Sequence, residues 1–125
     1  MTPTVVIADD DGDIRLLVTI SAAKAGLDVV ADVADGDAAI EAIRRLVPDL
    51  AVLDVAMPGL TGVEVCRLVR ADPALEHVRV LLLSAAADDG SVQAGLSAGA
   101  IDYLPKPFSP RELAARLMVH TGASQ

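Results

Sequence analysis

Short apolar runs alternate with stretches of helical periodicity along the 125 residues of this chain. The first run, 4–8 (TVVIA), is continuously apolar and rich in β-branched residues, which is typical of a strand buried on both faces of a sheet. Ile14, Val18 and Ala22 then recur at helical spacing, and Gly26 is the residue type that commonly ends a helix. The same pairing repeats four more times. We expect strands at 4–8, 28–31, 50–53, 78–83 and 101–104, and helices from 14, at 35–46, 61–70 and 88–97, and from 110.

Five strand–helix units in succession predict an α/β fold with a doubly wound, five-stranded parallel sheet and helices on both faces. The expected class is flavodoxin-like (βα)5 with strand order 2-1-3-4-5. Two helix starts are well marked. Thr61 and Glu64 have the spacing of a capping box, and Ser109, Pro110 and Glu112 combine an N-cap, an N1 proline and a capping-box glutamate. The helix at 88–97 is the least well marked, because it contains two glycines.

Composition excludes several classes of protein. The formal net charge of −8 disfavours direct binding of nucleic acid, whose phosphates repel an acidic surface. One cysteine allows neither an intrachain disulfide nor a cysteine-based zinc site. No apolar run reaches the roughly 18 residues of a membrane span, and the N-terminus lacks the pattern of a secretory signal. We therefore expect a cytoplasmic protein without membrane contact, with residues 1–125 forming a single domain.

Polar side chains stand where the expected strands end. Asp9 and Asp10 follow the first strand, and Asp54 follows the third. Ser84 follows the fourth strand, and Lys106 lies just past the fifth. Ligands of doubly wound sheets bind at the carboxyl ends of the strands, at the point where the strand order reverses. In the order 2-1-3-4-5 that point lies between strands 1 and 3, so these five side chains are expected to converge.

Three carboxylates in one place repel each other unless a cation lies between them. Mg²⁺ is the natural candidate, because it prefers oxygen ligands and is usually held by one or two carboxylates together with water and phosphate oxygens. A carboxylate can also attack phosphorus as a nucleophile. A lysine ammonium and a serine hydroxyl are suitable groups to hold the oxygens of a transferred phosphoryl group. The set is therefore suited to phosphoryl transfer.

Four stretches of the sequence together carry a resemblance to a known family. They are 7–15 (IADDDGDIR), 52–62 (VLDVAMPGLTG), 82–85 (LLSA) and 102–108 (DYLPKPF). In this order and at this spacing, the chain resembles a CheY-like response-regulator receiver domain of two-component signalling over nearly all its length. The resemblance implies a phosphorylation switch that catalyses only its own phosphorylation and dephosphorylation.

The resemblance also implies a role for each matching residue. Asp54 would be the phosphoacceptor and a metal ligand. Asp10 would ligate Mg²⁺ directly, Asp9 would help through water, and Ala56 would offer its backbone carbonyl to the metal. Ser84 would bind a phosphoryl oxygen and Lys106 would pair with the acyl phosphate. Tyr103 would change its orientation with the state of Ser84, and the Lys106–Pro107 peptide bond would be cis.

The partners implied by the resemblance are proteins. A histidine kinase or a phosphotransfer protein would donate the phosphoryl group, and a downstream protein or a fused output domain would respond to it. The alternative is a phosphorelay carrier that passes the group to a histidine phosphotransfer protein. A homodimer through helix 4, strand 5 and helix 5 is also expected, since Asp102, Glu112 and Arg116 match that use. The basic helix-4 partners are missing, however, and Glu112 and Arg116 are spaced to pair within the last helix.

Other functions fit the sequence less well. A haloacid-dehalogenase-like phosphatase needs a second aspartate two residues after the nucleophile, where this chain has Ala56. A flavin or nucleotide binder needs a phosphate-binding loop after strand 1, and the acidic loop would repel that ligand. A receiver-like module that is never phosphorylated would not need the complete set of five polar residues.

Several residues have a simpler structural interpretation. Asp11 and Asp13 are expected to act as the N-cap and first-turn acids of helix 1. Cys66 is expected to pack in the core with the valines around it. His77 and His120 match no metal-binding spacing and are expected to be surface histidines.

Overall fold

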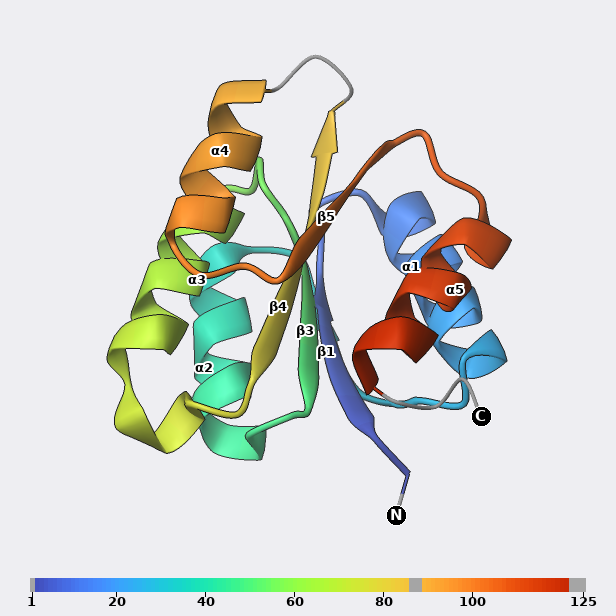
Figure 1. Ribbon diagram of the computed structural model, residues 1–125, viewed down its shortest axis with the longest axis horizontal. Helices are drawn as coiled ribbons and strands as arrows, with labels where there is room; N and C mark the ends of the chain where they lie inside the picture. The colour runs from blue at the N-terminus through green and yellow to red at the C-terminus, as the bar shows by residue number, and fades with distance from the viewer. Residues whose placement is uncertain (1, 86–88, 122–125) are drawn as a thin grey trace.

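The computed structural model describes residues 2–85 and 89–121 and has one parallel sheet with the strand order β2-β1-β3-β4-β5 (Figure 1). The predicted fold class and strand order are confirmed. The strands are β1 Thr4–Ala8, β2 Asp28–Val33, β3 Leu50–Asp54, β4 Arg79–Ala85 and β5 Asp102–Lys106. The helices are α1 Gly12–Lys24, α2 Gly36–Leu46, α3 Gly62–Ala71, the 3₁₀ turn η1 Pro73–Leu75, α4 Asp89–Ser97 and α5 Pro110–Thr121.

Helices cover both faces of the sheet, with α1 and α5 on one side and α2, α3 and α4 on the other (Figure 1). Alternate residues of β1 point into different cores. Val6 packs with α2 and α3 residues such as Ile43 and Val69, whereas Ile7 packs with α1 and α5 residues such as Leu117. Both cores consist mainly of aliphatic side chains. The central strands are therefore buried on both faces. Their carboxyl ends differ from the rest of each strand because they carry buried polar side chains.

The helix starts follow the predicted side-chain signals. Thr61 and Glu64 form both hydrogen bonds of a capping box at α3. The Ser109 hydroxyl accepts from the backbone N–H of Glu112 at 3.1 Å, and the Glu112 carboxylate accepts in return from Ser109 N–H. The side chain of Asp11 caps α1 by accepting from two backbone N–H groups of the first turn. The structural interpretation of Asp11 is thus confirmed.

Some boundaries differ from the prediction. β3 ends at Asp54, β4 at Ala85 and β5 at Lys106, so Asp54, Ser84 and Lys106 belong to their strands rather than following them. η1 was not predicted; the side chain of Asp72 caps it by accepting from Ala74 N–H at 3.0 Å. Residue 88, the first residue of the predicted fourth helix, lies outside the described residues. The Lys106–Pro107 bond is cis, as the resemblance implied.

Two helix ends contrast in their chemistry. Gly26 follows α1 with a φ of 79°, which a glycine adopts without strain. Val47 follows α2 with a φ of 44°, where a β-branched side chain is unusual. Glycine therefore marks the end of α1 but not the end of α2.

None of the helices in the described part of the chain has the length and apolar character that crossing a bilayer requires.

Gly62, the first residue of α3, packs directly against the end of β3. A Cβ atom at this position would collide with the backbone carbonyl of Asp54 and lie 3.1 Å from the Cα atom of Val55. The Gly62 N–H also donates to the Val55 carbonyl at 3.0 Å. The close approach fixes where the helix begins relative to the carboxyl end of the central strand.

We expect Gly62→Ala to destabilise the fold by about 1–3 kcal/mol, the usual cost of overpacking against backbone. Gly90→Ala is the matched control, because a Cβ at that α4 position meets no atom of the described residues within 4 Å. The substitution also replaces a poor helix former. Urea unfolding of both variants checks the expectation. Equal stability of Gly62→Ala and the unmodified protein would contradict the packing argument.

Candidate functional site

Three carboxylates meet at the carboxyl edge of the sheet. β1 and β3 are parallel neighbours with Ala8 opposite Leu53, so the residues that follow in each strand lie side by side. Asp9, Asp10 and Asp54 each offer an oxygen, and these three oxygens lie within 4.8 Å of one another. Asp9 and Asp54 are buried, whereas Asp10 is exposed. We call this cluster, together with Lys106, the acidic pocket; the predicted convergence of its residues agrees with the structure.

Lys106 reaches across β4 from β5 and lies between the two buried carboxylates. Its Nζ atom is 3.0 Å from Oδ2 of Asp9 and 3.3 Å from Oδ1 of Asp54. The side chain is 22% exposed, so the ammonium is partly removed from water. One positive charge thus faces two buried negative charges, which leaves the acidic pocket with net negative charge.

The pKa values of these groups reflect that imbalance. Burial raises the pKa of Asp54 and the charge of Asp9 raises it further, and contact with Lys106 only partly offsets both effects. Burial by itself would lower the pKa of Lys106. Its hydrogen bonds to Asp9 and Asp54 and their charges outweigh burial, so this pKa is raised. Lys106 is therefore held in its protonated form, whereas the charged form of Asp54 is disfavoured, and a further cation would relieve that penalty.

Backbone groups hold the two buried carboxylates in place. Oδ1 of Asp9 accepts from the N–H of Asp11 at 2.9 Å, and Oδ1 of Asp54 accepts from the N–H of Ala56 at 3.4 Å. The backbone N–H of Asp9 donates to the carbonyl of Val33 on β2 at 3.1 Å. Main-chain contacts of this kind orient a carboxylate without adding a competing side chain.

Ser84 and Tyr103 lie near the acidic pocket but are not bonded into it. Leu83 of β4 is opposite Asp54, so Ser84 is one residue further along the neighbouring strand. Ser84 is buried, and its hydroxyl donates to the carbonyl of Ala85 at 3.1 Å. Tyr103 on β5 is 38% exposed. The adjacent strands β4 and β5 therefore carry a buried hydroxyl and a partly exposed aromatic side chain, respectively.

Asp102 on β5 forms hydrogen bonds with three partner residues, contacts that sequence reasoning missed. Its carboxylate accepts from Nη1 of Arg116 at 2.8 Å, lies 2.8 Å from Nε2 of His120, and accepts from Tyr103 N–H. Burial alone would raise the pKa of Asp102, but these bonds outweigh it and lower that pKa. The expectation that His120 is an isolated surface residue is wrong, because α5 turns it toward β5. Arg116 likewise pairs with Asp102, not with Glu112 of its own helix.

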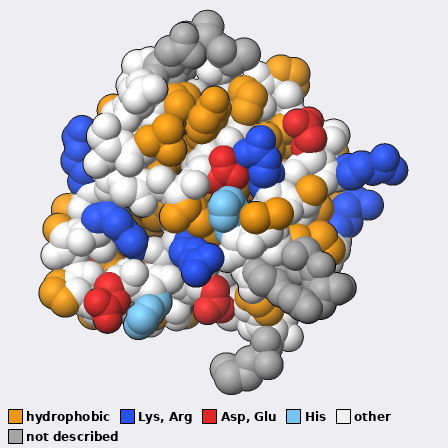
Figure 2. Space-filling model, viewed as in Figure 1, with side chains coloured by type: hydrophobic (Ala, Val, Ile, Leu, Met, Phe, Trp, Pro, Cys, Tyr) orange, Lys and Arg blue, Asp and Glu red, His pale blue; other side chains and the backbone are white. Residues whose placement is uncertain are grey.

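The α4–β5–α5 face combines this charged group with exposed apolar side chains. Leu96, Ile101 and Tyr103 are each between 38% and 39% exposed. Figure 2 shows acidic, basic and histidine side chains gathered near the middle of the face, below a group of hydrophobic ones. By contrast His77 is an exposed histidine and Cys66 is buried, both as predicted.

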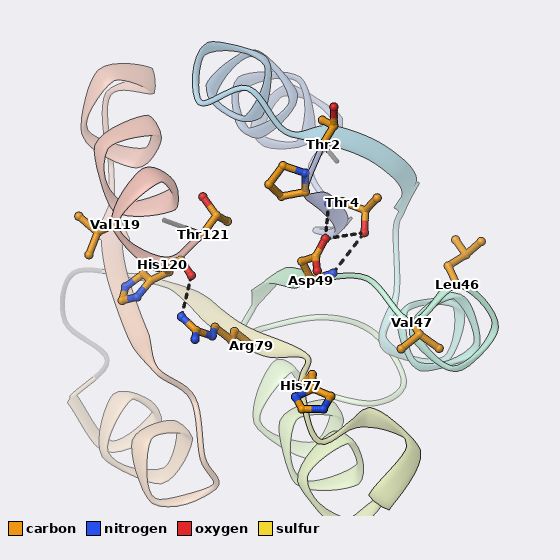
Figure 3. Close-up of a pocket in the computed structure, with 11 residues that line it drawn as sticks. Thr2, Thr4, Leu46, Val47, Asp49, His77, Arg79, Val119, His120 and Thr121 are labelled. Carbon is orange, nitrogen blue, oxygen red and sulfur yellow. Dashed lines mark hydrogen bonds between the residues drawn. The ribbon is translucent and has the colours of Figure 1, made fainter. Parts of the chain in front are cut away.

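A hollow of about 840 Å³ lies at the opposite end of the molecule, around the amino ends of the strands (Figure 3). Among the described residues, its lining has a single carboxylate, Asp49, which accepts from the N–H of Thr4 at 2.8 Å. Arg79 donates there to the carbonyl of His120 at 2.7 Å. This hollow lacks grouped carboxylates, so the chemistry of the acidic pocket belongs to the other end of the sheet.

Comparison with known proteins agrees with this geometry. The family model described as "Response regulator receiver domain" matches residues 5–118. The chain belongs to the response regulator receiver domain family. It is thus the receiver domain of a response regulator in two-component signalling. A helix or strand of the fold accounts for most of the matched region, and the acidic pocket lies within it.

Individual proteins extend the comparison. The DNA-binding response regulator MtrA of Mycolicibacterium paratuberculosis is 41% identical over 117 residues, which are 94% of this chain and 50% of MtrA. The chain therefore spans about half the length of this curated relative. Chemotaxis response regulator CheY4 of Vibrio cholerae has a TM-score of 0.87 and 30% identity, covering 96% of this chain and 99% of that one.

A third comparison includes a metal. The receiver domain of the sensor histidine kinase PA1611 of Pseudomonas aeruginosa has a TM-score of 0.85 and 29% identity, and the alignment covers 98% of this chain and 99% of that one. Its structure has a magnesium ion coordinated in the active site cleft.

The raised pKa of Asp54 predicts that its charge costs folding stability at neutral pH. A folded pKa above the unfolded value of about 3.9 means that protonation favours the fold, and this benefit is lost as pH rises through the folded value. Asp54→Asn should therefore melt higher than the unmodified protein at pH 7 in EDTA, by about 4 °C for a gain on the order of 1 kcal/mol. The difference should shrink as pH falls toward 4.

Asp28→Asn, which changes an exposed aspartate of β2, is the control for general loss of negative charge. Thermal melting followed by circular dichroism is sufficient for all three proteins. A lower melting temperature for Asp54→Asn than for the unmodified protein at pH 7 would show that contact with Lys106 outweighs burial.

Proposed function

We propose that Asp54 accepts a phosphoryl group from a phosphohistidine of a histidine kinase or a phosphotransfer protein. The observation that carries the proposal is the burial of Asp54 beside Asp9, Asp10 and a protonated Lys106. A carboxylate with a raised pKa and an adjacent ammonium is suited to form a bond to an incoming phosphorus and to have the new charge compensated. The domain acting in this way comprises residues 1–125.

The transfer involves one bond made and one bond broken. An oxygen of the Asp54 carboxylate attacks the phosphorus while the phosphorus–nitrogen bond of the donor breaks, and the departing imidazole keeps that electron pair and takes up a proton. The product is an acyl phosphate on Asp54. Lys106, already 3.3 Å from Asp54, would move onto a phosphoryl oxygen, and Ser84 on the adjacent strand would donate its hydroxyl to another.

The residues of the acidic pocket fit a magnesium ion. The fit rests on three carboxylate oxygens within 4.8 Å of one another and on negative charge that Lys106 alone does not balance. Asp10, Asp54 and the backbone carbonyl of Ala56 would hold the metal, and Asp9 would contact it through water. When bound, the metal neutralises charge on the transferred phosphoryl oxygens. The magnesium ion in the related PA1611 domain supports the assignment.

The signal would leave through the α4–β5–α5 face. Movement of Ser84 toward a phosphoryl group would open room beneath β5, and Tyr103 would turn inward and remove its ring from the surface. Tyr103 is well placed for this, because its side chain is exposed and its cross-strand partner, Leu82, lies two residues before Ser84 on β4. Ser84 itself is buried. Phosphorylation would then shift a balance between two forms rather than create a new one.

The receiver of the signal would be a downstream protein or a fused output domain. The chain covers only half of MtrA, a protein named as DNA-binding, so DNA contact would be the task of a part outside the receiver fold. A homodimer through the same face would have to compete with the bond between Asp102 and Arg116, which is satisfied within one chain. Equilibrium sedimentation with and without beryllofluoride, a phosphoryl mimic, shows whether the phosphorylated form becomes a homodimer or stays monomeric.

Incubation with Mg²⁺ and acetyl phosphate should add one acid-labile phosphoryl group, because the acidic pocket itself supplies positioning and charge stabilisation. Asp54→Asn should not be modified, since an amide is not a competent nucleophile. Intact-protein mass spectrometry measures both. A stable phosphoserine at Ser84 with Asp54 unmodified would refute the proposal.

Beryllofluoride with Mg²⁺ should shift backbone amide signals in β4, α4 and β5 in addition to those around Asp54. In Ser84→Ala the shifts near Asp54 should persist and those in α4 and β5 should be lost, because the hydroxyl that links the two regions is gone. Nuclear magnetic resonance spectra of both proteins check this. Shifts confined to the loops after β1 and β3 in the unmodified protein would indicate a phosphoryl carrier instead of a switch.

A further inference from the structure

Arg15, in the second turn of α1, touches the acidic pocket from outside. Long side chains on a helix point back toward its N-terminus, and Arg15 accordingly folds over the loop that joins β1 to α1. Its Nη1 atom donates to the backbone carbonyl of Asp9 at 2.7 Å. Its Nε atom donates to Oδ1 of Asp32 on β2 at 3.1 Å. The guanidinium thus bridges the loop and the neighbouring strand.

The bridge completes the fixation of Asp9. The N–H of Asp9 donates to the carbonyl of Val33, its carboxylate accepts from Asp11 N–H and Lys106, and its carbonyl accepts from Arg15. Asp9 itself is fully buried. Every polar group of this residue is therefore held, and Arg15 is the side chain that holds the carbonyl, directly before Asp10 in the chain.

Two effects of Arg15 on a cation in the acidic pocket would have opposite signs. As a positive charge near three carboxylates, Arg15 would repel a metal ion, so its removal would tighten binding. As an anchor of the loop, it would keep Asp9 and Asp10 in a geometry suited to the metal, so its removal would weaken binding. The guanidinium uses one nitrogen for the Asp9 carbonyl, after β1, and another for the Asp32 carboxylate on β2. This two-point attachment favours the second effect.

We propose that Arg15 is a positioning residue for the metal site, acting on Asp9 and Asp10 through the backbone and anchored by Asp32. This inference rests on the proposed binding of Mg²⁺. Asp32 is 45% exposed and Arg15 is 26% exposed, so the anchor lies at the rim and does not itself enter the acidic pocket. The role of Arg15 is geometric and does not require it to touch the phosphoryl group.

Three variants test the proposal. Arg15→Gln removes the charge and the fork, Arg15→Lys keeps the charge and loses the fork, and Arg45→Gln removes an exposed arginine of α2 as the control. Titration of Mg²⁺ followed by backbone amide shifts gives the affinity directly. We expect about tenfold weaker binding for Arg15→Gln, the usual size of an outer-shell effect, weakening in the same direction for Arg15→Lys, and no change for the control.

Phosphorylation by acetyl phosphate gives a second readout. In both Arg15 variants the half-saturating Mg²⁺ concentration should rise, while the rate at saturating Mg²⁺ should stay within about twofold of the unmodified protein. Melting curves show whether each variant is folded. Arg15→Lys retains the charge and most of the apolar stem, so it decides the question if Arg15→Gln does not fold.

The outcomes separate the two proposals. If the unmodified protein does not bind Mg²⁺, the proposed function fails. If the unmodified protein binds Mg²⁺ but Arg15→Lys binds it equally well, the positioning role is overturned. Tighter binding by Arg15→Gln than by the unmodified protein would also overturn it, since Arg15 would then act only as a repelling charge.

Discussion

The burial of two like charges at the end of a sheet is the constraint on which the rest of the structure depends. Asp9 and Asp54 have almost no contact with solvent, and the ammonium that lies between them comes from Lys106, two strands away from β3. A buried carboxylate is tolerated only with hydrogen bonds and a nearby opposite charge. The sheet therefore has to bring its first, third and fifth strands to a common edge.

That requirement explains several local features. The backbone of the β1–α1 loop is fixed from β2 and α1, and a glycine allows α3 to begin against the end of β3. Each device restricts movement of a carboxylate without placing another side chain in the acidic pocket. The Asp102 group, by contrast, ties α5 to β5 on the α4–β5–α5 face. Separate sets of hydrogen bonds thus hold the acidic pocket and the α4–β5–α5 face.

Much of this arrangement was predictable because it depends on local or periodic information. Strand and helix order follows from hydrophobic periodicity, and the helix starts follow from Thr61, Asp11 and Ser109. The convergence of the acidic pocket follows from the parallel topology. The bond of His120 to Asp102 was not predictable, because 18 residues separate the two and no pattern marks the contact. Arg15 had one available signal: it lies one turn into the helix after an acidic loop, toward which its side chain should point.

Val47 has a consequence for the evolution of the protein. A valine with a φ of 44° and half of its surface exposed occupies a helix end where glycine would be relaxed. Its side chain contributes to the hollow at the amino ends of the strands and not to either core. The conformational strain, of order 1–3 kcal/mol for such a residue, is therefore not repaid by burial. Replacement of Val47 by glycine would relieve this strain, and the stability gained could compensate for a destabilising substitution elsewhere in the fold.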